Sequence, residues 1–338
     1  MDFKYIVGSR FGLNKFIKSK ANDELISIFD TSISSLNVGD GIINDSARKE
    51  LRKVFPLKQF ATFPTHVGLT PKGIFLHNNC YQSFVCGTNI LNSNMFLNKQ
   101  WDVDILDALR MKPLVLMGCG WGSYQKKSNL YTKKLLNILL SKEHLHSVRD
   151  SYTLKMLEDA GIKNVINTSC PTMWALTSDS MQKVPIQKSN SVVFTLTDYR
   201  KDYENDNFLI DFLRNNYDSV SYWVQGSDDL KYLHSLGDFK DIKIIPPNLE
   251  SYDAFLSDNS CDFVGTRLHA GIRALQNKRR TLIIGVDNRA EEKKKDFNLP
   301  VINRGNLKTE LERIVLNDFK TELRIDESSI LSWKSQFL

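Results

Sequence analysis

The chain has 338 residues, of which 41% are hydrophobic and 25% are charged, so its composition is that of a globular protein. This excludes fibrous and low-complexity chains, and the length suits two domains of about 150 residues each. The formal net charge of +6 favours anionic substrates or contact with an anionic membrane surface. No basic stripe is interleaved with aromatic residues, so we expect no nucleic-acid partner.

No segment predicts a membrane span or an export signal. The longest apolar runs, at 113–118 and 281–286, are much shorter than the roughly 20 residues that a spanning helix needs. The opening residues MDFKYIVGSRFG lack a basic segment followed by an apolar one. We therefore predict a cytoplasmic protein without a signal peptide.

The first half of the chain alternates short β-rich runs with helical patterns. Strands are predicted at 24–32, 82–87, 113–118, 144–148 and 163–167. Helices are predicted at 37–55, 129–142 and 149–161. This alternation is typical of an open, mainly parallel sheet.

A polar segment at 178–191 contains a proline and has no periodicity, so we predict a linker there. Strands are then predicted at 191–197, 219–225, 242–247, 261–265 and 281–287. Helices are predicted near 205–216, 228–236, 250–257 and 267–276, and two more within 307–338 that close the C-terminal end. We expect two Rossmann-like, doubly wound α/β domains facing a cleft, at 1–180 and 190–338, with ligands beyond the carboxyl ends of the strands.

Two glycine-containing loops follow predicted strands in the first domain. In NVGDG (37–41), Asp40 can cap the next helix, and a ligand contact is an equal alternative. In GCGWGSYQ (118–125), glycines such as Gly120 let the backbone approach a ligand, and Trp121 offers an apolar platform to a sugar ring. The G-x-G-x-G spacing is not that of a dinucleotide loop, so a plain structural turn is equally compatible.

The stretch SVRDSY (147–152) places Arg149 where a strand turns into a helix that Asp150 or Ser151 can cap. A cation at a helix N-terminus is unfavourable unless an anion or a carboxylate lies nearby. Two interpretations follow, a bound anion or an ion pair between Arg149 and Asp150.

The stretch GTRLHAGIRAL (265–275) also joins a strand to a helix, which Thr266 is placed to cap. The N-terminus of this helix and the adjacent Arg267 both favour an anion. The apolar stripe of the helix is Leu268, Ile272 and Leu275. Because His269 is off that stripe, we expect it to face the cleft.

No pattern predicts a metal site. The five cysteines form no C-x-x-C pair, which favours free thiols in a reducing compartment, and the six histidines are scattered. WDVDILDAL (101–109) contains Asp-x-Asp, which holds a metal–nucleotide pair in some glycosyltransferases. Its acids also favour the N-terminus of an amphipathic helix, and we predict that role.

Together, NVGD at 37–40, SVRDSYTLKMLEDAG at 147–161 and GTRLHAGIRALQNKRRTLIIGVD at 265–287 resemble the polysaccharide pyruvyltransferase family, over roughly residues 25–305. The resemblance implies a two-domain fold like that of GT-B glycosyltransferases. It also implies transfer of pyruvate from phosphoenolpyruvate onto two hydroxyls of a sugar, which forms a cyclic ketal. No cofactor is implied besides this donor substrate.

Phosphoenolpyruvate carries a phosphate and a carboxylate, which suit the forked donors of Arg149 and Arg267. His269 titrates near neutral pH, so it can protonate the enol carbon or accept a hydroxyl proton. The resemblance associates Arg149 and His269 with activity, and we take them as catalytic. The donor-binding residues that it implies are Arg149, Arg267, Leu268, Arg289 and Gly120.

The acceptor implied is a hexose of a surface polysaccharide or of its lipid-linked oligosaccharide precursor. We expect the first domain to bind it near Asn37, Asp40 and Trp121. A lipid-linked acceptor would bring this basic enzyme into peripheral contact with the inner face of the membrane. The sequence predicts no oligomeric state.

The chain departs from the family pattern in three places. Many relatives have a run of glycines where this chain has VCGTNIL (85–91), so Gly87 and Thr88 stand alone. Cys170 stands where relatives often have an aspartate before proline, and Arg289 stands where a lysine is common. The arginine keeps the positive charge of that lysine.

Two alternative functions fit the same architecture. One is a glycosyltransferase that uses a sugar nucleotide, although the second half of the chain lacks the pair of glutamates eight positions apart that many such enzymes have. The other is a non-catalytic carbohydrate-binding relative, which the altered glycine loop motivates. One architecture hosts many functions, so the fold does not decide among them.

Overall fold

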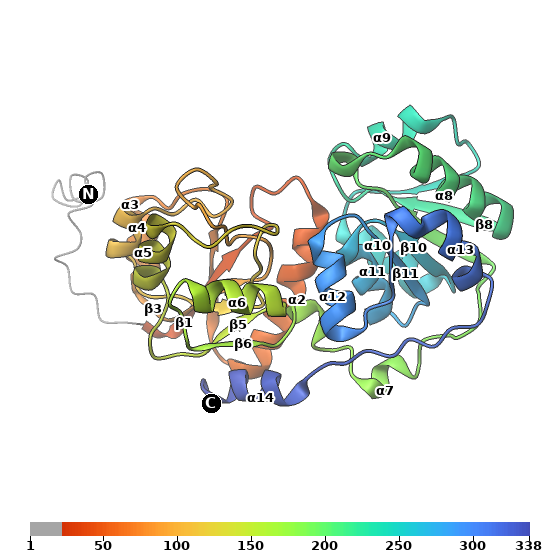
Figure 1. Cartoon of the computed structure of the whole chain (residues 1–338). Helices are drawn as coiled ribbons and strands as arrows, with labels where there is room; N and C mark the ends of the chain where they lie inside the picture. The colour runs from red at the N-terminus through yellow and green to blue at the C-terminus, as the bar shows by residue number, and fades with distance from the viewer. Residues whose placement is uncertain (1–21) are drawn as a thin grey trace, which may run out of the picture. The chain divides into compact units, whose positions relative to one another are not determined.

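The computed structural model describes residues 22–338, which form two compact units (Figure 1). Unit 1 consists of 22–35, 43–171 and 328–338, and unit 2 consists of 36–42 and 172–327. These units differ from the predicted domains in three places. Residues 36–42 and 172–180 group with unit 2, and the C-terminal helix groups with unit 1.

Unit 1 has a parallel sheet whose strands follow the predicted order. They are β1 (Asn22–Asp30), β2 (Gln59–Pro64), β3 (Cys80–Cys86), β4 (Val115–Met117), β5 (His146–Val148) and β6 (Val165–Asn167). The first four pair in the order β2-β1-β3-β4, and β5 pairs with β6. A parallel bridge between Cys119 and Val148 joins the two sets. The resulting order, β2-β1-β3-β4-β5-β6, is that of flavodoxin-like sheets.

Helices cover this sheet where the sequence has apolar periodicity. They are α2 (Val38–Val54), α3 (Pro71–Asn78), α4 (Ile105–Arg110), α5 (Leu130–Leu139), α6 (Ser151–Asp159) and α14 (Glu327–Ser335). In α2 the apolar residues Ile43, Ala47 and Leu51 recur at helical spacing, and all three are buried. Strand β2 and helix α3 were not predicted, although Thr70 and Pro71 form a recognisable helix start in which Thr70 accepts from the Gly73 N–H.

Unit 2 has a six-stranded parallel sheet in the order β12-β11-β10-β7-β8-β9. The strands are β7 (Ser191–Thr195), β8 (Ser219–Trp223), β9 (Lys243–Ile245), β10 (Asp262–Gly265), β11 (Thr281–Gly285) and β12 (Val301–Asn303). This is the strand order of the Rossmann fold, with its switch point between β7 and β10. The two Rossmann-like units confirm the predicted fold class.

Both faces of the unit 2 sheet are covered by helices. They are α8 (Tyr203–Asn216), α9 (Asp229–Leu236), α10 (Leu249–Asp258), α11 (Leu268–Gln276), α12 (Asn288–Phe297) and α13 (Leu307–Val315), after the short α7 (Ser178–Met181) in the predicted linker. Val192 and Phe194 pack in the core that includes α8, α9 and α13, whereas Val193 packs in the core with α10, α11 and α12. Successive side chains of a strand point to opposite faces of the sheet, and here both faces are covered. Every residue of such a strand is therefore buried, and the strand appears in the sequence as a continuous apolar run.

Among the described residues, no helix is both long enough and apolar enough to cross a bilayer. The predicted helix at 101–109 is α4, and Asp104 caps it by accepting from the Asp107 N–H at 2.8 Å. The helix-opening role of the Asp-x-Asp stretch is thus confirmed. All five cysteines are free and buried.

Helix α14 completes the core of unit 1. Trp333 is fully buried, and its ring contacts those of Phe84 and Phe337 at centroid distances of 5.8 and 5.1 Å. Gln336 also pairs with the backbone of Leu145, accepting from its N–H at 2.7 Å and donating to its carbonyl at 3.0 Å. The predicted closing role of this helix belongs to unit 1, because Trp333 and the following Phe337 cover Phe84 of β3.

We predict that Trp333→Ala destabilises the protein by about 3–5 kcal/mol, because it leaves a cavity between aromatic rings. Leu331→Ala, in the same helix but 64% exposed, is the matched control and should change stability by less than about 0.5 kcal/mol. Urea unfolding followed by far-UV circular dichroism measures both. Equal shifts of the two variants would contradict this packing role.

Two buried histidines should make unit 1 sensitive to acid. Burial lowers the pKa of His77 and His146 to about 4, although each ring also contacts a backbone carbonyl. The His146 ring is neutral because Nδ1 accepts from the Leu116 N–H at 3.2 Å. Below pH 6.5 these two histidines bind protons in the unfolded chain but not in the folded one, so the free energy of unfolding falls between pH 6.5 and 4.

The free energy of unfolding should therefore fall by about 2 kcal/mol for each histidine when the pH is lowered from 7 to 5. His146→Gln should lower stability at pH 7 and lose its share of this pH dependence. Urea midpoints of wild type and variant at the two pH values give the comparison. An unchanged pH dependence in the variant would rule out His146 as a source.

Candidate functional site

Arg149 lies at the carboxyl end of β5 and is 3% exposed. Its Nε donates to the Asp150 carboxylate at 2.9 Å, Nη2 donates to the Trp121 carbonyl at 3.0 Å, and Nη1 donates to the Asn89 side chain. The predicted ion pair with Asp150 is thus present. Since a guanidinium has five N–H groups, these contacts leave one on each terminal nitrogen without a partner among residues 22–338.

Asp150 is the N-cap of α6, where its Oδ1 accepts from the Thr153 N–H at 2.7 Å. Burial raises the pKa of the Asp150 carboxyl, but the Arg149 charge and the Thr153 hydrogen bonds outweigh it and hold the pKa below its ordinary value. Asp150 is therefore ionised at neutral pH, and it compensates the charge of Arg149 while capping the helix.

Gly120 makes room for Arg149. A Cβ atom at Gly120 would lie 2.0 Å from Nε of Arg149, so only glycine lets the guanidinium pass. The Gly120 N–H donates to the Thr88 carbonyl at 2.8 Å. Sequence reasoning expected this backbone to approach a ligand, and the structure places an arginine side chain against it.

The loop after β3 holds the Asn89 side chain against Arg149. Gly87 and Thr88 have φ angles of 65° and 59°, in the left-handed region that favours glycine. For the β-branched Thr88 this conformation costs on the order of 1–3 kcal/mol. The run of glycines that many relatives have in this loop thus includes positions whose φ is positive in this chain. Sequence reasoning missed Asn89, whose only signal was its place beside those positions.

The three residues predicted to bind the acceptor belong to different units. Trp121 is fully buried in the core of unit 1, and its Nε1 donates to Gln125 at 2.9 Å. This corrects the expectation of an exposed platform, because the ring has no free face. Asn37 and Asp40 belong to the segment 36–42 of unit 2.

Asn37 pairs with the loop after β8. Its Oδ1 accepts from Nε2 of Gln225 at 2.7 Å and from the Gly39 N–H at 3.0 Å. Asp40 lies in the first turn of α2, so Asn37 rather than Asp40 takes the capping role expected at this helix start.

Arg267 lies at the switch point of unit 2, at the end of β10, and is 3% exposed. Its Nε donates to Asp229 and to the Leu196 carbonyl, both at 3.0 Å. Its Nη2 donates to Asp198 at 2.7 Å and also to Asp229. Arg267 thus ties together the loops that follow β7, β8 and β10.

Asp229 is fully buried and also accepts from the Gly226 N–H at 2.7 Å. Burial lowers the pKa of Arg267, but Asp229 opposes this and leaves the pKa above its ordinary value. A Cβ atom at Gly226 would lie 2.1 Å from Nη2 of Arg267. Unit 2 therefore repeats the arrangement of unit 1, with a buried arginine, a carboxylate partner and a glycine that leaves space.

The start of α11 differs from the prediction. Thr266 does not cap the helix, since its hydroxyl lies 2.8 Å from that of Thr197. Arg267 occupies the N-cap position, but its side chain makes no capping hydrogen bond to the helix. Leu268 and His269 begin the helix, and His269 is 7% exposed. The helix is buried from Leu268 to Leu275, His269 included, so burial does not separate the apolar stripe from its other faces. That His269 faces the cleft stays a prediction.

Arg289 joins the same edge of the unit 2 sheet. Its Nε donates to Asp287, the N-cap of α12, at 2.9 Å, and its Nη2 donates to the Tyr199 hydroxyl at 2.6 Å. Burial lowers the pKa of Arg289, but Asp287 and Tyr199 reverse this and raise it. The Tyr199 ring also lies 5.1 Å from Cζ of Arg267, so Tyr199 links the two arginines.

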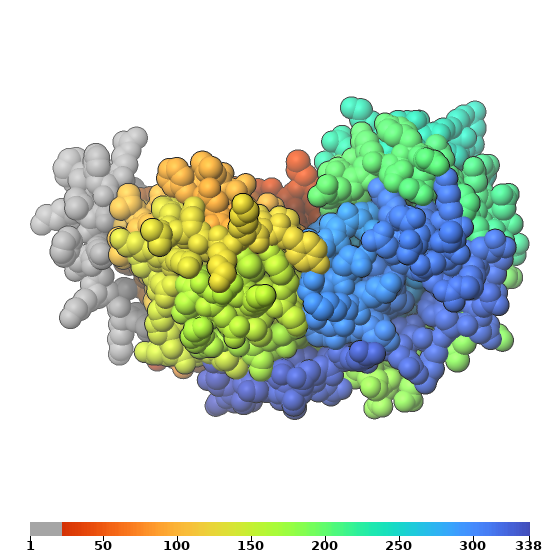
Figure 2. Space-filling model, in the orientation of Figure 1, coloured from red at the N-terminus to blue at the C-terminus, as the bar shows by residue number. Residues whose placement is uncertain are grey.

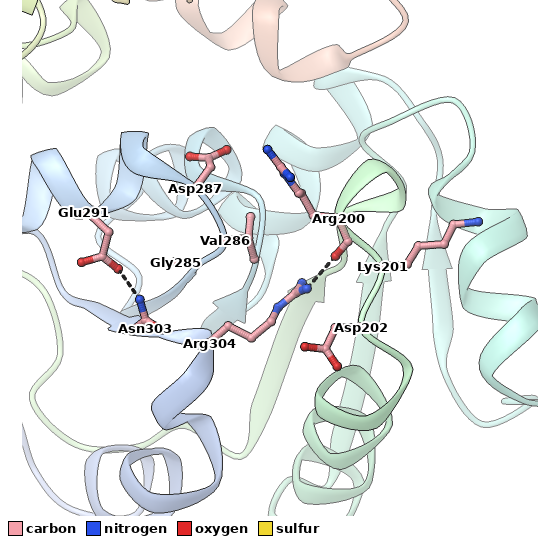
Figure 3. A pocket seen from close by; sticks show the side chains of 9 residues that line it. All are labelled: Arg200, Lys201, Asp202, Gly285, Val286, Asp287, Glu291, Asn303 and Arg304. Carbon is pink, nitrogen blue, oxygen red and sulfur yellow. Dashed lines mark hydrogen bonds between the residues drawn. The ribbon is translucent and has the colours of Figure 1, made fainter. Parts of the chain in front are cut away.

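A pocket of about 340 Å³ opens at this edge of unit 2 (Figure 3). It is lined by Arg200, Lys201, Asp202, Gly285, Val286, Asp287, Glu291, Asn303 and Arg304. Nη1 of Arg304 donates to the Arg200 carbonyl at 2.5 Å, and Nδ2 of Asn303 donates to Glu291 at 3.1 Å. The pocket has the size and polarity for a small polar ligand. Sequence reasoning missed it because β12 was not predicted.

Within residues 22–338 the structure has no cluster of three or more histidine, cysteine or acidic side chains placed to hold a metal ion. The polar side chains at the carboxyl edges of the two sheets include arginines, carboxylates and His269. This set suits the binding of oxyanions and the transfer of protons.

Solved structures share the fold at low sequence identity. The structure of MnaA from S. aureus with UDP is 12% identical, with a TM-score of 0.51 over 93% of this chain and 94% of that chain. A Listeria monocytogenes protein assigned as a UDP-N-acetylglucosamine 2-epimerase is 11% identical, with a TM-score of 0.52 over 94% and 97%. Both are similar in fold, and they bear out the GT-B-like architecture.

Among curated protein sequences, none matches this chain significantly. The family model is more informative. The model described as polysaccharide pyruvyl transferase matches residues 37–288, which is well over half of the chain and includes the loops of both Arg149 and Arg267. The chain therefore belongs to the polysaccharide pyruvyl transferase family, an enzyme family.

Proposed function

We propose that this enzyme transfers pyruvate from phosphoenolpyruvate onto two hydroxyls of a sugar, which forms a cyclic ketal and releases phosphate. The acceptor is a sugar of a surface polysaccharide or of its lipid-linked precursor. The observation that carries the proposal is a buried arginine at the carboxyl end of a parallel strand in each unit, within the span that matches the family. A donor with two anionic groups needs such cations.

In unit 1, we assign donor binding to Arg149. The free N–H groups on Nη1 and Nη2 are available to one oxyanion, and the Asp150 and Asn89 contacts hold the guanidinium in place. Preorganised donors of this kind do not need to reorganise when the ligand arrives. Gly120 supports donor binding indirectly, since it leaves the space that Arg149 occupies.

In unit 2, Arg267 serves mainly to position its neighbours, because two carboxylates already compensate its charge. Among the described residues Nη1 has no hydrogen bond, and it is the atom of Arg267 that we assign to the donor. Arg289 and the backbone N–H of Leu268, in the first turn of α11, complete the proposed anion contacts of this unit.

His269 moves the protons in this scheme. A proton added to the methylene carbon of phosphoenolpyruvate makes it a methyl group and leaves the adjacent carbon electrophilic. Two sugar hydroxyls then bond to that carbon as the phosphate leaves. Of the two hydroxyl protons, one balances the proton added to carbon and the other leaves with the phosphate. A single histidine can donate the first and accept one from a hydroxyl.

For the acceptor, Asn37 and Asp40 remain the proposed contacts, and the buried Trp121 is withdrawn from this role. A glycosyltransferase that uses a sugar nucleotide is the second candidate, favoured only by the GT-B-like fold. The same experiment can separate the two functions, because their donors differ.

The donor test is a thermal-shift titration with phosphoenolpyruvate and, separately, with UDP- and GDP-sugars. At a hundred times its dissociation constant, a ligand stabilises the folded state by about 2.7 kcal/mol, a shift of a few degrees in Tm. We expect phosphoenolpyruvate to shift the wild type, Arg149→Gln to lose the shift, and His269→Gln to keep it without turnover. A shift with sugar nucleotides alone would make the enzyme a glycosyltransferase.

A pair of glycine variants tests the packing around Arg149. Gly120→Ala puts a methyl group in the place of the guanidinium and should weaken phosphoenolpyruvate binding by about tenfold or more. Gly122→Ala is the matched control, since its new Cβ atom would have no neighbour nearer than 3.6 Å. Calorimetric titration of both, after circular dichroism has verified folding, gives the result. Equal affinities would refute the role of Gly120.

A further inference from the structure

Positive charge is concentrated in one part of unit 1. Residues 51–142 contain twelve lysines and arginines but only three acids, Asp102, Asp104 and Asp107. Two of these acids form the capping box of α4, and Asp102 accepts from the Gly68 N–H at 2.9 Å. Five of the twelve form ion pairs, namely Lys53 with Glu50, Lys58 with Glu24, Lys99 with Asp102, Arg110 with Asp107 and Lys127 with Asp159. The remaining positive charge includes surface lysines of this region, while the formal charge of the whole chain is +6.

Large apolar side chains are exposed in the same region. Phe96 and Leu97, in the loop after β3, are 62% and 72% exposed, and Leu130, at the start of α5, is 85% exposed. Tyr124, in the loop after β4, is also exposed. Single exposed apolar residues are ordinary, but a set of them beside a surplus of lysines marks an interaction surface.

These residues form one surface because the two loops are tied together. The Asn129 N–H donates to the Ser93 carbonyl at 3.0 Å, and the Ser93 N–H donates to Gln125 at 2.8 Å. The Phe96 ring contacts the Tyr131 ring at 5.2 Å. In Figure 2 the two segments, in orange and yellow, lie side by side on the visible face of unit 1.

The lysines of this surface are Lys126, Lys127, Lys133 and Lys134. Lys127 pairs with Asp159 at 3.2 Å. The other three form no ion pair within the described part of the chain. Their charge is thus available to an anionic partner.

We infer that this loop surface docks unit 1 onto an anionic lipid bilayer. Phe96, Leu97 and Leu130 would enter the interface between headgroups and acyl chains, and the lysines would contact the headgroups. A nucleic acid is a poorer fit, because two of the most exposed side chains are leucines, which cannot stack on bases.

The surface also belongs to the edge that holds Arg149. The loop after β3 carries Asn89 and the loop after β4 carries the Trp121 carbonyl, and both contact that guanidinium. A bilayer bound to these loops would keep a lipid-linked sugar near the same edge. This last link rests on the proposed function, whereas the lipid contact itself does not.

The test is co-sedimentation of the full chain with phosphatidylcholine vesicles and with vesicles that also contain phosphatidylglycerol, at physiological salt. We expect binding to the anionic vesicles only. Replacing Lys126, Lys133 and Lys134 by glutamine should weaken it about a hundredfold, at roughly fivefold per lysine. Phe96→Ser with Leu97→Ser should weaken it about tenfold.

Two controls make the result specific to this surface. Lys294→Gln with Lys295→Gln removes exposed charge from unit 2, and Leu331→Ser removes an exposed leucine from α14, and neither should change binding. No binding to anionic vesicles, or equal binding by the lysine variant, would overturn the inference. So would full binding by the Phe96 and Leu97 variant together with competition by an oligonucleotide, which would indicate a general polyanion site.

Failure of this inference can be told apart from failure of the proposed function. The lysine variant should keep the thermal shift that phosphoenolpyruvate causes in the wild type, since these lysines do not touch Arg149. If the protein binds vesicles but shows no thermal shift with phosphoenolpyruvate, the docking surface is supported and the proposed donor is wrong.

Discussion

The buried guanidinium is the constraint on which both sheet edges depend. An unpaired charge in a protein interior is costly, so a buried arginine needs a carboxylate partner and space for a large planar group. Arg149 has Asp150 and the space left by Gly120, whereas Arg267 has Asp229 and the space left by Gly226. In each unit the loop geometry follows from these needs.

This arrangement limits how an anion can be bound. The carboxylates neutralise most of the arginine charge, so recognition depends on the few N–H groups that point away from them. Arg289 follows the same rule, because Asp287 and Tyr199 already occupy its Nε and Nη2. Fixed N–H donors in a buried site are strong partners for an oxyanion, which is why the proposed function assigns the donor to them.

Local patterns predicted most of the fold, and long-range partners explain what they missed. The strand–helix alternation and the stretches around Arg149 and Arg267 were enough for the fold class and the family. Periodicity could not reveal that Asp229, 38 residues from Arg267, is its partner, or that α14 packs in unit 1. Periodicity also could not show that Trp121 is buried. A glycine-rich sequence predicts an exposed loop, and it gives no sign of whether a neighbouring loop covers that loop.

The most direct test of the account is the fate of phosphoenolpyruvate itself. The protein is incubated with phosphoenolpyruvate and a panel of hexose glycosides, and the mixture is followed by phosphorus and proton nuclear magnetic resonance. The account predicts that inorganic phosphate is released only when an acceptor is present. It also predicts a new proton signal from the methyl group on the ketal carbon. Intact phosphoenolpyruvate with every acceptor, alongside conversion of a sugar nucleotide, would contradict it.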